Sequence, residues 1–277
     1  MKRLALVAAL IASVNFADAQ YYYKDIVVTR QISGTYKLLR DNKVRGIQGT
    51  PFEGNRPVTE GILLQQTLYP QQNMLITHTK AANTTESWLK SYYSQSGLLV
   101  RTIDSAQDLV NRSNYTYDDG GKLLVISSTL TPRNNPAETE VHQWTYTATG
   151  KPAQMLKIKN GSDTTFVNYT ADEQGNAGEE HVTRKKNNLG TTYYYYNGGG
   201  QLTDIARYNK RVDKVLPDYI FEYNDQGLVG QMIVVPEGTS DYQIWRYLYN
   251  DKGLKEKEIC FNKQKQMVGR VEYAYQF

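Results

Sequence analysis

The pattern of aromatic, polar and branched positions repeats along this chain. Two aromatic residues stand at i and i+2, a polar turn-forming segment follows, and a branched apolar residue comes next. The full pattern is Tyr-x-Tyr-x-x-x-Gly-x-Leu, found at Tyr115, Tyr117, Gly121, Leu123 and at Tyr194, Tyr196, Gly200, Leu202. Two variants carry Leu one place early, after Phe221, Tyr223, Gly227 and after Tyr247, Tyr249, Gly253.

Weaker copies extend the repeat toward the N-terminus. They are centred on Gly150, Gly175 and Gly97, and, with Asn in the glycine place, on Asn73 and Asn42. The markers at 42, 73, 97, 121, 150, 175, 200, 227 and 253 lie 24 to 31 residues apart. The faintest copy is Tyr36, Leu38, Asn42 and Val44. We expect clear repeats from about residue 91 and degenerate ones over residues 33–90.

Each repeat reads as a β-hairpin. Residues i and i+2 of a strand share a face, so the paired aromatics form a patch on one side. The segments that follow, such as Asn224-Asp225-Gln226, are turn material, because Asn and Asp bond their own backbone and Gly adopts positive φ at little cost. Proline in the linkers at Pro132, Pro136, Pro217 and Pro236 marks the opposite ends of the hairpins.

The predicted fold is therefore all-β: an extended antiparallel meander of roughly nine hairpins in one domain over residues 20–277, twisted or curved. Whether the sheet is open, sandwiched or closed is left undecided. We expect an N-terminal strand over Gln20 to Ile32 and a helical turn over Asn83 to Lys90. The poorly matching N-terminal units and the final half-unit are the expected caps of the sheet ends.

The first residues predict export. Lys2 and Arg3 precede an apolar run that is too short to span a bilayer, and Ala17-Asp18-Ala19 is a cleavage pattern. We expect a signal peptide over residues 1–19, a mature chain from Gln20, and a periplasmic, outer-membrane-surface or secreted location. No later segment has the apolar length of a transmembrane helix.

Tyrosine is unusually frequent, at 23 residues against 6 Phe and 3 Trp. Cross-strand aromatic pairs stabilise sheets, so tyrosine ladders explain this surplus structurally. The alternative is an aromatic platform that binds a glycan or peptide. Its first candidates are Trp144, Tyr146, Trp245 and Tyr247.

The sequence offers little catalytic chemistry, and we expect no catalytic residue, cofactor or metal site. The single cysteine, Cys260, has no adjacent base, and His78, His142 and His181 have no metal-ligand spacing. His142 should share the face of Trp144. Glu179 and Glu180 are neighbours on a strand and should face opposite ways, unlike a glycosidase pair.

The charge distribution argues against nucleic acid as a partner and includes one local group of basic residues. The formal net charge is +4 with both signs dispersed, which does not indicate nucleic-acid binding. Arg184-Lys185-Lys186, with Lys210 and Arg211, could form a basic edge at one end of the sheet or be ordinary solvated linker charge.

The best copy, Tyr115-Thr116-Tyr117-Asp118-Asp119-Gly120-Gly121-Lys122-Leu123, resembles the YD repeat of Rhs-type bacterial proteins. That resemblance implies β-sheets that coil into spirals or shells and act as scaffolds, in some members for toxin delivery and in others for surface recognition, including of carbohydrate. This chain has a longer period, few repeats and no recognisable toxin domain, so the resemblance bears on architecture.

Three functions remain open. The first is a non-catalytic scaffold or interaction protein of the cell envelope, with an envelope protein or surface glycan as its partner. The second is a glycan- or peptide-binding protein. The third is an outer-membrane β-barrel, favoured by the alternating C-terminal segment ending at Phe277 and opposed by Lys255, Glu256, Lys257 and Glu258 on both faces of one strand.

Overall fold

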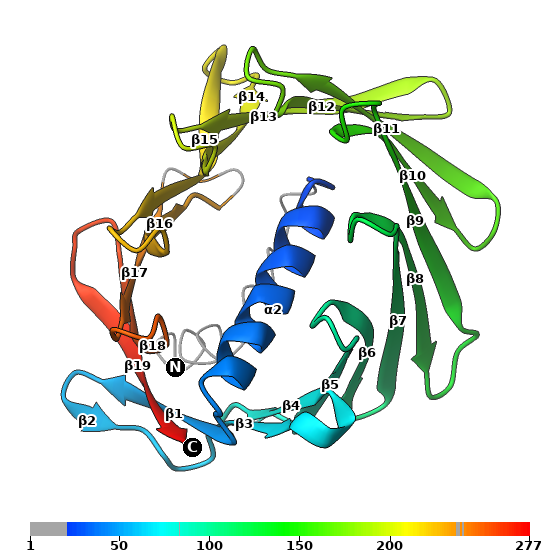
Figure 1. Cartoon of the computed structure of the whole chain (residues 1–277). Helices are drawn as coiled ribbons and strands as arrows, with labels where there is room; N and C mark the ends of the chain where they lie inside the picture. Colours follow the sequence, from blue (N-terminus) through cyan, green and yellow to red (C-terminus); the bar gives the residue numbers. More distant parts are fainter. Residues whose placement is uncertain (1–20, 83, 237–238, 240) are drawn as a thin grey trace.

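The computed structural model describes residues 21–82, 84–236, 239 and 241–277, and there the chain forms one α-helix followed by a meander of strands (Figure 1). Helix α2 spans Lys24–Asp41, and a 3-10 turn spans Pro70–Gln72. The first strands are β1 Gly46–Glu53, β2 Arg56–Pro57, β3 Leu63–Tyr69, β4 Met74–Lys80, β5 Ser87–Tyr93, β6 Leu99–Ala106, β7 Leu109–Tyr117, β8 Leu123–Pro132 and β9 Glu138–Tyr146. The others are β10 Pro152–Lys159, β11 Asp163–Ala171, β12 Ala177–Arg184, β13 Asn187–Tyr196, β14 Leu202–Asn209, β15 Lys214–Tyr223, β16 Val229–Val234, β17 Gln243–Tyr249, β18 Lys255–Phe261 and β19 Met267–Gln276.

The sheet is closed. Each strand from β3 to β19 pairs antiparallel with the next, and β1 pairs with both β3 and β19. The described strands thus form an 18-strand barrel, with the two-residue β2 attached to β1. The predicted antiparallel meander is confirmed, and the undecided question of closure is answered. The expectation of capped ends was wrong, because the first and last long strands cover each other's edges.

The predicted turns lie together at one end of the barrel, which we call the turn end. Gly97, Gly121, Gly150, Gly175, Gly200, Gly227 and Gly253 all have φ between 73° and 84°. In the unit at Asn224, the side-chain Oδ1 accepts from the backbone N–H of Leu228 at 2.9 Å, and Gly227 N–H donates to the Asn224 carbonyl at 2.8 Å. Asp118, Asp172, Asn197 and Asn250 do the same in their turns. In these five turns the Asx residue and the glycine therefore determine the conformation locally, and Ser94 and Thr147 take the Asx place in the turns at Gly97 and Gly150.

In six repeats the second aromatic links one hairpin to the preceding one. Its hydroxyl donates to a backbone carbonyl at or next to the start of the preceding return strand. The pairs are Tyr117–Leu99, Tyr146–Leu123, Tyr196–Ala177, Tyr223–Leu202, Tyr249–Val229 and Tyr275–Lys255, at 2.5 to 3.0 Å. We call these the tyrosine latches. Because each spans neighbouring hairpins, they explain why the motif uses Tyr rather than Phe at this place.

Two local predictions were wrong. Residues 24–41 form a helix rather than a strand and a degenerate hairpin, because Ile26, Thr29, Ser33, Tyr36 and Leu39 repeat at helical spacing and are buried on one face. Asn42 is the C-cap of this helix rather than the turn of a hairpin, and Lys43 follows it with φ 59°. Ser87–Tyr93 is strand β5, so the helical turn expected over residues 83–90 is absent from its described part.

Helix α2 lies inside the ring of strands (Figure 1). Its C-terminal half packs near the turn end, where Tyr36 and Leu39 cluster with Leu75, Tyr93 and Leu99. Its N-terminal end lies toward the opposite end of the barrel, which we call the mouth. The core of this protein is therefore the contact between one helix and the inner face of the barrel.

Candidate functional site: the helix-occupied lumen

Apolar side chains line the barrel wall where the helix meets it. Around the middle of the wall, Tyr21 packs with Tyr194, Ile205 and Tyr219. Tyr22 and Ile26 pack in a neighbouring cluster of buried residues, Leu123, Trp144, Met155, Val167 and Val182. Burying such side chains supplies most of the free energy that holds an element in place. The helix is thus an integral part of the core.

Glu180 fixes the start of the helix. Its side chain is fully buried on β12, and its oxygens accept from the backbone N–H of Tyr22 at 2.9 and 3.0 Å and of Tyr23 at 2.9 Å. The hydroxyls of Tyr169 and Tyr194 donate to the same carboxyl at 2.9 and 2.8 Å. The helix begins after Tyr23 without a side-chain cap of its own. Glu180 therefore provides from the wall the capping that the helix N-terminus needs.

Burial raises the pKa of Glu180, and the four hydrogen bonds oppose that shift. Burial, together with the charge of Glu180, raises the pKa of Tyr169 and of Tyr194 well above the ordinary value. Both phenols thus remain donors. The carboxyl of Glu180 is thus held by two donors from the start of the helix and two from the wall.

A second polar contact lies one turn further along the helix. His142 on β9 contacts Asp25 at 2.6 Å through Nδ1 and Glu140 at 3.0 Å through Nε2, and Lys157 contacts Glu140 at 2.9 Å. Burial alone would lower the pKa of His142, but Asp25 and Glu140 outweigh it and raise that pKa to about 9. The hydrogen bond from His142 lowers the pKa of Glu140 to about 2. The group is an ion-paired anchor for α2.

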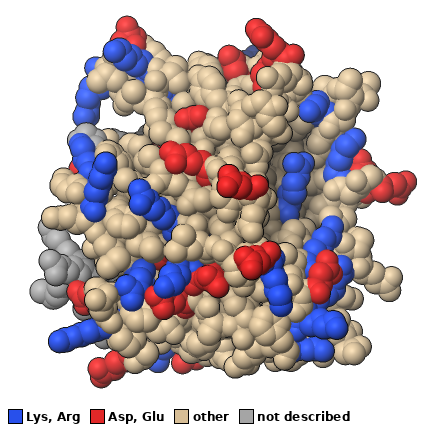
Figure 2. All heavy atoms as spheres, turned by 60° about the vertical axis from the view of Figure 1, so that its left-hand side comes forward, with Lys and Arg blue, Asp and Glu red and all other residues tan. Residues whose placement is uncertain are grey.

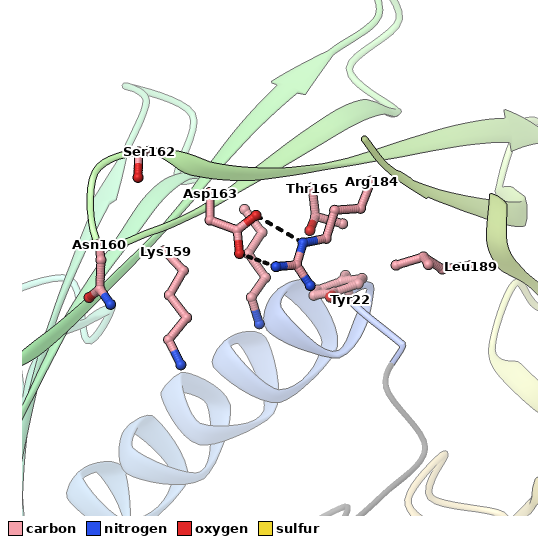
Figure 3. A pocket seen from close by; sticks show the side chains of 9 residues that line it. Tyr22, Lys159, Asn160, Ser162, Asp163, Thr165, Arg184 and Leu189 are labelled. Carbon is pink, nitrogen blue, oxygen red and sulfur yellow. Dashed lines mark hydrogen bonds and ion pairs between the residues drawn. The ribbon is translucent and has the colours of Figure 1, made fainter. Parts of the chain in front are cut away.

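A cavity of about 530 Å³ opens at the mouth beside Tyr22 (Figure 3). Its charged lining residues are Lys157, Lys159, Asp163 and Arg184, and its other lining residues are Asn160, Ser162, Thr165 and Leu189. Arg184 pairs with Asp163, and Lys159 with Glu138 at 2.7 Å. With the contact between Lys157 and Glu140, each of these three cations has a carboxylate partner.

The four candidate ligand-binding aromatics do not form one exposed platform. Trp144 is 3% exposed in the lumen wall, and the hydroxyl of Tyr146 is in a latch. Trp245 and Tyr247 are half-buried on β17, where Lys255 lies 4.7 Å from the Tyr247 ring centre. Binding of a ligand by these residues stays a prediction. The exposed tryptophan is instead Trp88, at 40%, stacked on His78 outside the barrel.

The remaining candidate residues have structural surroundings. Cys260 is fully buried, and burial raises the pKa of its thiol to about 12. Glu179 faces outward and pairs with His181 at 2.9 Å, while Glu180 faces the lumen, as the strand alternation predicted. His142 does share the inner face with Trp144. Among the described residues no group of three or more His, Cys, Asp or Glu could hold a metal ion.

Sequence reasoning missed Glu180 and Asp25 as site residues. A carboxylate at an inward position between Tyr169 and Tyr194 was the available signal for Glu180. The inward assignment of Glu180 rather than Glu179 needed the register of β12 against β11 and β13. Glu180 contacts Tyr22, 158 residues away, and Asp25 contacts His142, 117 residues away. Neither contact is signalled by the neighbouring sequence.

The outer wall carries mixed charge. Figure 2, which brings the left-hand side of Figure 1 forward, shows acidic and basic side chains interspersed over the surface. On the outward face of neighbouring strands, Arg270 and Lys257 both pair with Glu272, at 3.2 and 3.1 Å. Arg246 bonds to Gln231 at 3.0 Å on the same face. The wall is therefore apolar toward the helix and hydrophilic toward the outside over these strands.

Within the described ranges, no helix has both the length and the apolar character needed to cross a membrane.

No family model matches this chain, and no curated protein does. Among solved structures, it is similar to a porin-like protein from Bacteroides uniformis, at 10% identity and a TM-score of 0.37, over 84% of this chain and 98% of that one. It is also similar to the TcdB2–TccC3–Cdc42 structure, at 16% identity and a TM-score of 0.34. That match covers 75% of this chain and spans 11% of the other's length. Scores this low do not establish a shared fold, and the identities are too low to indicate a shared function.

Proposed function

We propose that this chain is an exported, non-catalytic barrel that acts as a scaffold or interaction protein of the cell envelope. The observation that carries the proposal is found over β16–β19, where Met232, Ile244 and Val271 are buried on the inner face and the outer face carries paired charges. Such a barrel is stabilised by its own core and presents a charged surface to water. Glu180 and His142, two polar residues of the inner face, hold the start of the helix, which is a structural role.

The tyrosine latches support a scaffold. Each latch joins one hairpin to the next, so load on one strand pair is shared with its neighbours. We also propose that the units are YD-like. The aromatic pair lies on a strand, and the Asx residue and the glycine form the turn that follows it, as the motif implies. The Rhs resemblance remains a proposal, and a scaffold role does not depend on it.

The outer-membrane barrel is the second candidate, and the closed 18-strand wall favours it. The charges on that wall weigh against it. A Lys or Arg facing lipid costs about 2–4 kcal/mol at the bilayer midplane, and Arg246, Lys257 and Arg270 lie on one outward surface. A spanning barrel also has a polar interior, whereas Met155, Val167 and Ile205 are fully buried inside this one.

Expression of the full chain in a Gram-negative host, followed by fractionation, separates the two candidates. We expect the exported chain to begin at Gln20 by mass spectrometry and to be released without detergent, by osmotic shock or by a high-salt wash. Retention in membranes after high salt and carbonate, with release only by detergent, would overturn the scaffold and favour the spanning barrel. The predicted leader lies outside the described residues, so the mass measurement tests it independently.

A further inference from the structure

Two neighbouring hairpin tips at the mouth expose apolar and basic side chains together. We call them the basic tips: residues 185–190, between β12 and β13, and residues 208–216, between β14 and β15. Every residue in both ranges is exposed. The tips are adjacent because β13 pairs with β14, with Thr192 opposite Arg207 just below them.

Large apolar side chains are concentrated at these tips. Leu189 is 58% exposed, and Tyr208, Val212, Val215 and Leu216 are 40–49% exposed. In the β14–β15 hairpin, Tyr208 lies opposite Val215 and Arg207 opposite Leu216. Successive pairs face opposite ways, so apolar side chains are on both faces of this tip. Exposing apolar side chains to water on both faces of a hairpin is unfavourable, and contact with an apolar partner would remove that cost.

A local excess of positive charge lies at the same place. The tips carry Lys185, Lys186, Lys210, Arg211 and Lys214, and one acid, Asp213. Five positive charges less one negative charge give +4, which equals the formal net charge of the whole sequence. The rest of the chain is therefore neutral overall. The hydroxyl of Tyr208 donates to Asp213, so the single carboxylate is engaged within the tip.

The turn of the first tip uses lysine where glycine or asparagine is favoured. Lys185 has φ 48° and Lys186 has φ 67°, and both are the central residues of the turn. Asn-Gly is preferred in turns that need positive φ at both positions, because other side chains are strained there. A strained backbone is a reason to look for a role of the side chains, and here they place two charges at the furthest point of the hairpin.

We propose that the basic tips bind the surface of a membrane that contains anionic lipid. Leu189, Val212 and Leu216 enter the headgroup region, and the lysines and Arg211 meet the lipid phosphates. Apolar insertion and electrostatic attraction add in such interfacial binding, and each basic residue near an anionic surface contributes about 1 kcal/mol. The binding of anionic lipid is inferred from the exposure and charge of the tips alone. Only the placing of that membrane in the cell envelope rests on the proposed function.

The probe is the mature chain with vesicles of phosphatidylcholine alone or with added phosphatidylglycerol, in flotation assays. We expect binding to the anionic vesicles only, and weaker binding as salt rises. The variant Lys185→Asn/Lys186→Gly places the preferred Asn-Gly pair in this turn, so the hairpin should be kept. Its partition coefficient between water and anionic vesicles should fall by about 30-fold, or roughly fivefold for each lysine. Val212→Trp should give a blue-shifted fluorescence increase on addition of anionic vesicles.

The matched control is Lys43→Gly/Lys265→Gly. It also removes two exposed lysines with positive φ, both of φ 59°, from other turns. Its binding should equal that of the unmodified chain. Equal losses in the two double variants, equal binding to neutral vesicles, or no binding at all would each overturn the inference. These outcomes differ from failure of the scaffold proposal, in which the chain cannot be released from its host membrane without detergent.

Discussion

Glu180 on β12 caps the N-terminus of the lumen helix at Tyr22, which lies 158 residues earlier in the chain, with N–O distances of 2.9 and 3.0 Å. A helix that starts without its own cap is thereby tied to the wall of the barrel. The contact couples the formation of the barrel with the placing of the helix.

Glu180→Gln should destabilise the protein by about 3 kcal/mol, because the amide places N–H donors against the Tyr22 and Tyr23 N–H groups and leaves buried donors without an acceptor. Urea unfolding measures the loss, and hydrogen exchange should show increased opening of residues 24–41. Glu179→Gln changes the adjacent outward carboxyl and should alter neither quantity by more than about 0.5 kcal/mol. Equal effects of the two variants would contradict the capping role.

The His142 contact predicts a pH dependence on the alkaline side. The pKa of His142 is raised from 6.5 to about 9 in the fold, so its contribution is complete below pH 6.5, where the imidazole is charged in both states. It is lost as pH rises to about 9. The free energy of unfolding should fall across this window by at most about 3 kcal/mol.

Urea melts between pH 6 and 9 measure this slope. The groups that face His142 are Asp25 from the helix, Glu140 from its own strand and the ring of Tyr22. His142→Gln should remove most of the slope, whereas His181→Gln, on the outward face, should keep it. The acid side is less informative, since the lowered pKa of Glu140 and the raised pKa of Glu180 act in opposite directions there.

The tyrosine latches should be separable and additive. Tyr223→Phe and Tyr117→Phe each remove one hydroxyl that donates to a carbonyl, at 2.7 and 2.6 Å, and each should cost about 1 kcal/mol in chemical denaturation. The double variant should cost the sum, because the latches are in distant units. Tyr195→Phe, on the outer wall at 49% exposure, is the control and should be near neutral. No loss in the latch variants would show that the rings alone determine stability.

Closure of the barrel predicts a specific cross-link. Gln48 on β1 lies opposite Ala274 on β19, and antiparallel partners have Cα atoms about 4.5–5.5 Å apart, within disulfide range. Gln48→Cys with Ala274→Cys should therefore form a disulfide under mild oxidation, seen as a mobility shift in non-reducing gels. Gln48→Cys with Lys257→Cys, one strand further from β1, should form none. An uncross-linked first pair would indicate an open sheet.

Much of the wall could be predicted from the sequence because its determinants are local. The Asx side chain and the glycine define each turn from within a few residues, and Tyr223 and its counterparts identify the strand that leads into it. Local chemistry of this kind is readable in Asn224 or Gly227 without any knowledge of the rest of the fold. The alternation that separates Glu179 from Glu180 is likewise a property of a single strand.

Only the tertiary structure decided that the sheet closes into a barrel and that a helix occupies its lumen. Pairing of β1 with β19 joins residues more than two hundred positions apart, and neither strand signals its partner. Residues 24–41 include β-branched Ile26, Val27, Val28 and Thr29, which favour strands locally, yet the helix is stabilised by burying one face against the barrel and by the Glu180 cap. The sequence by itself determined the hairpins, and packing around one helix determined what they enclose.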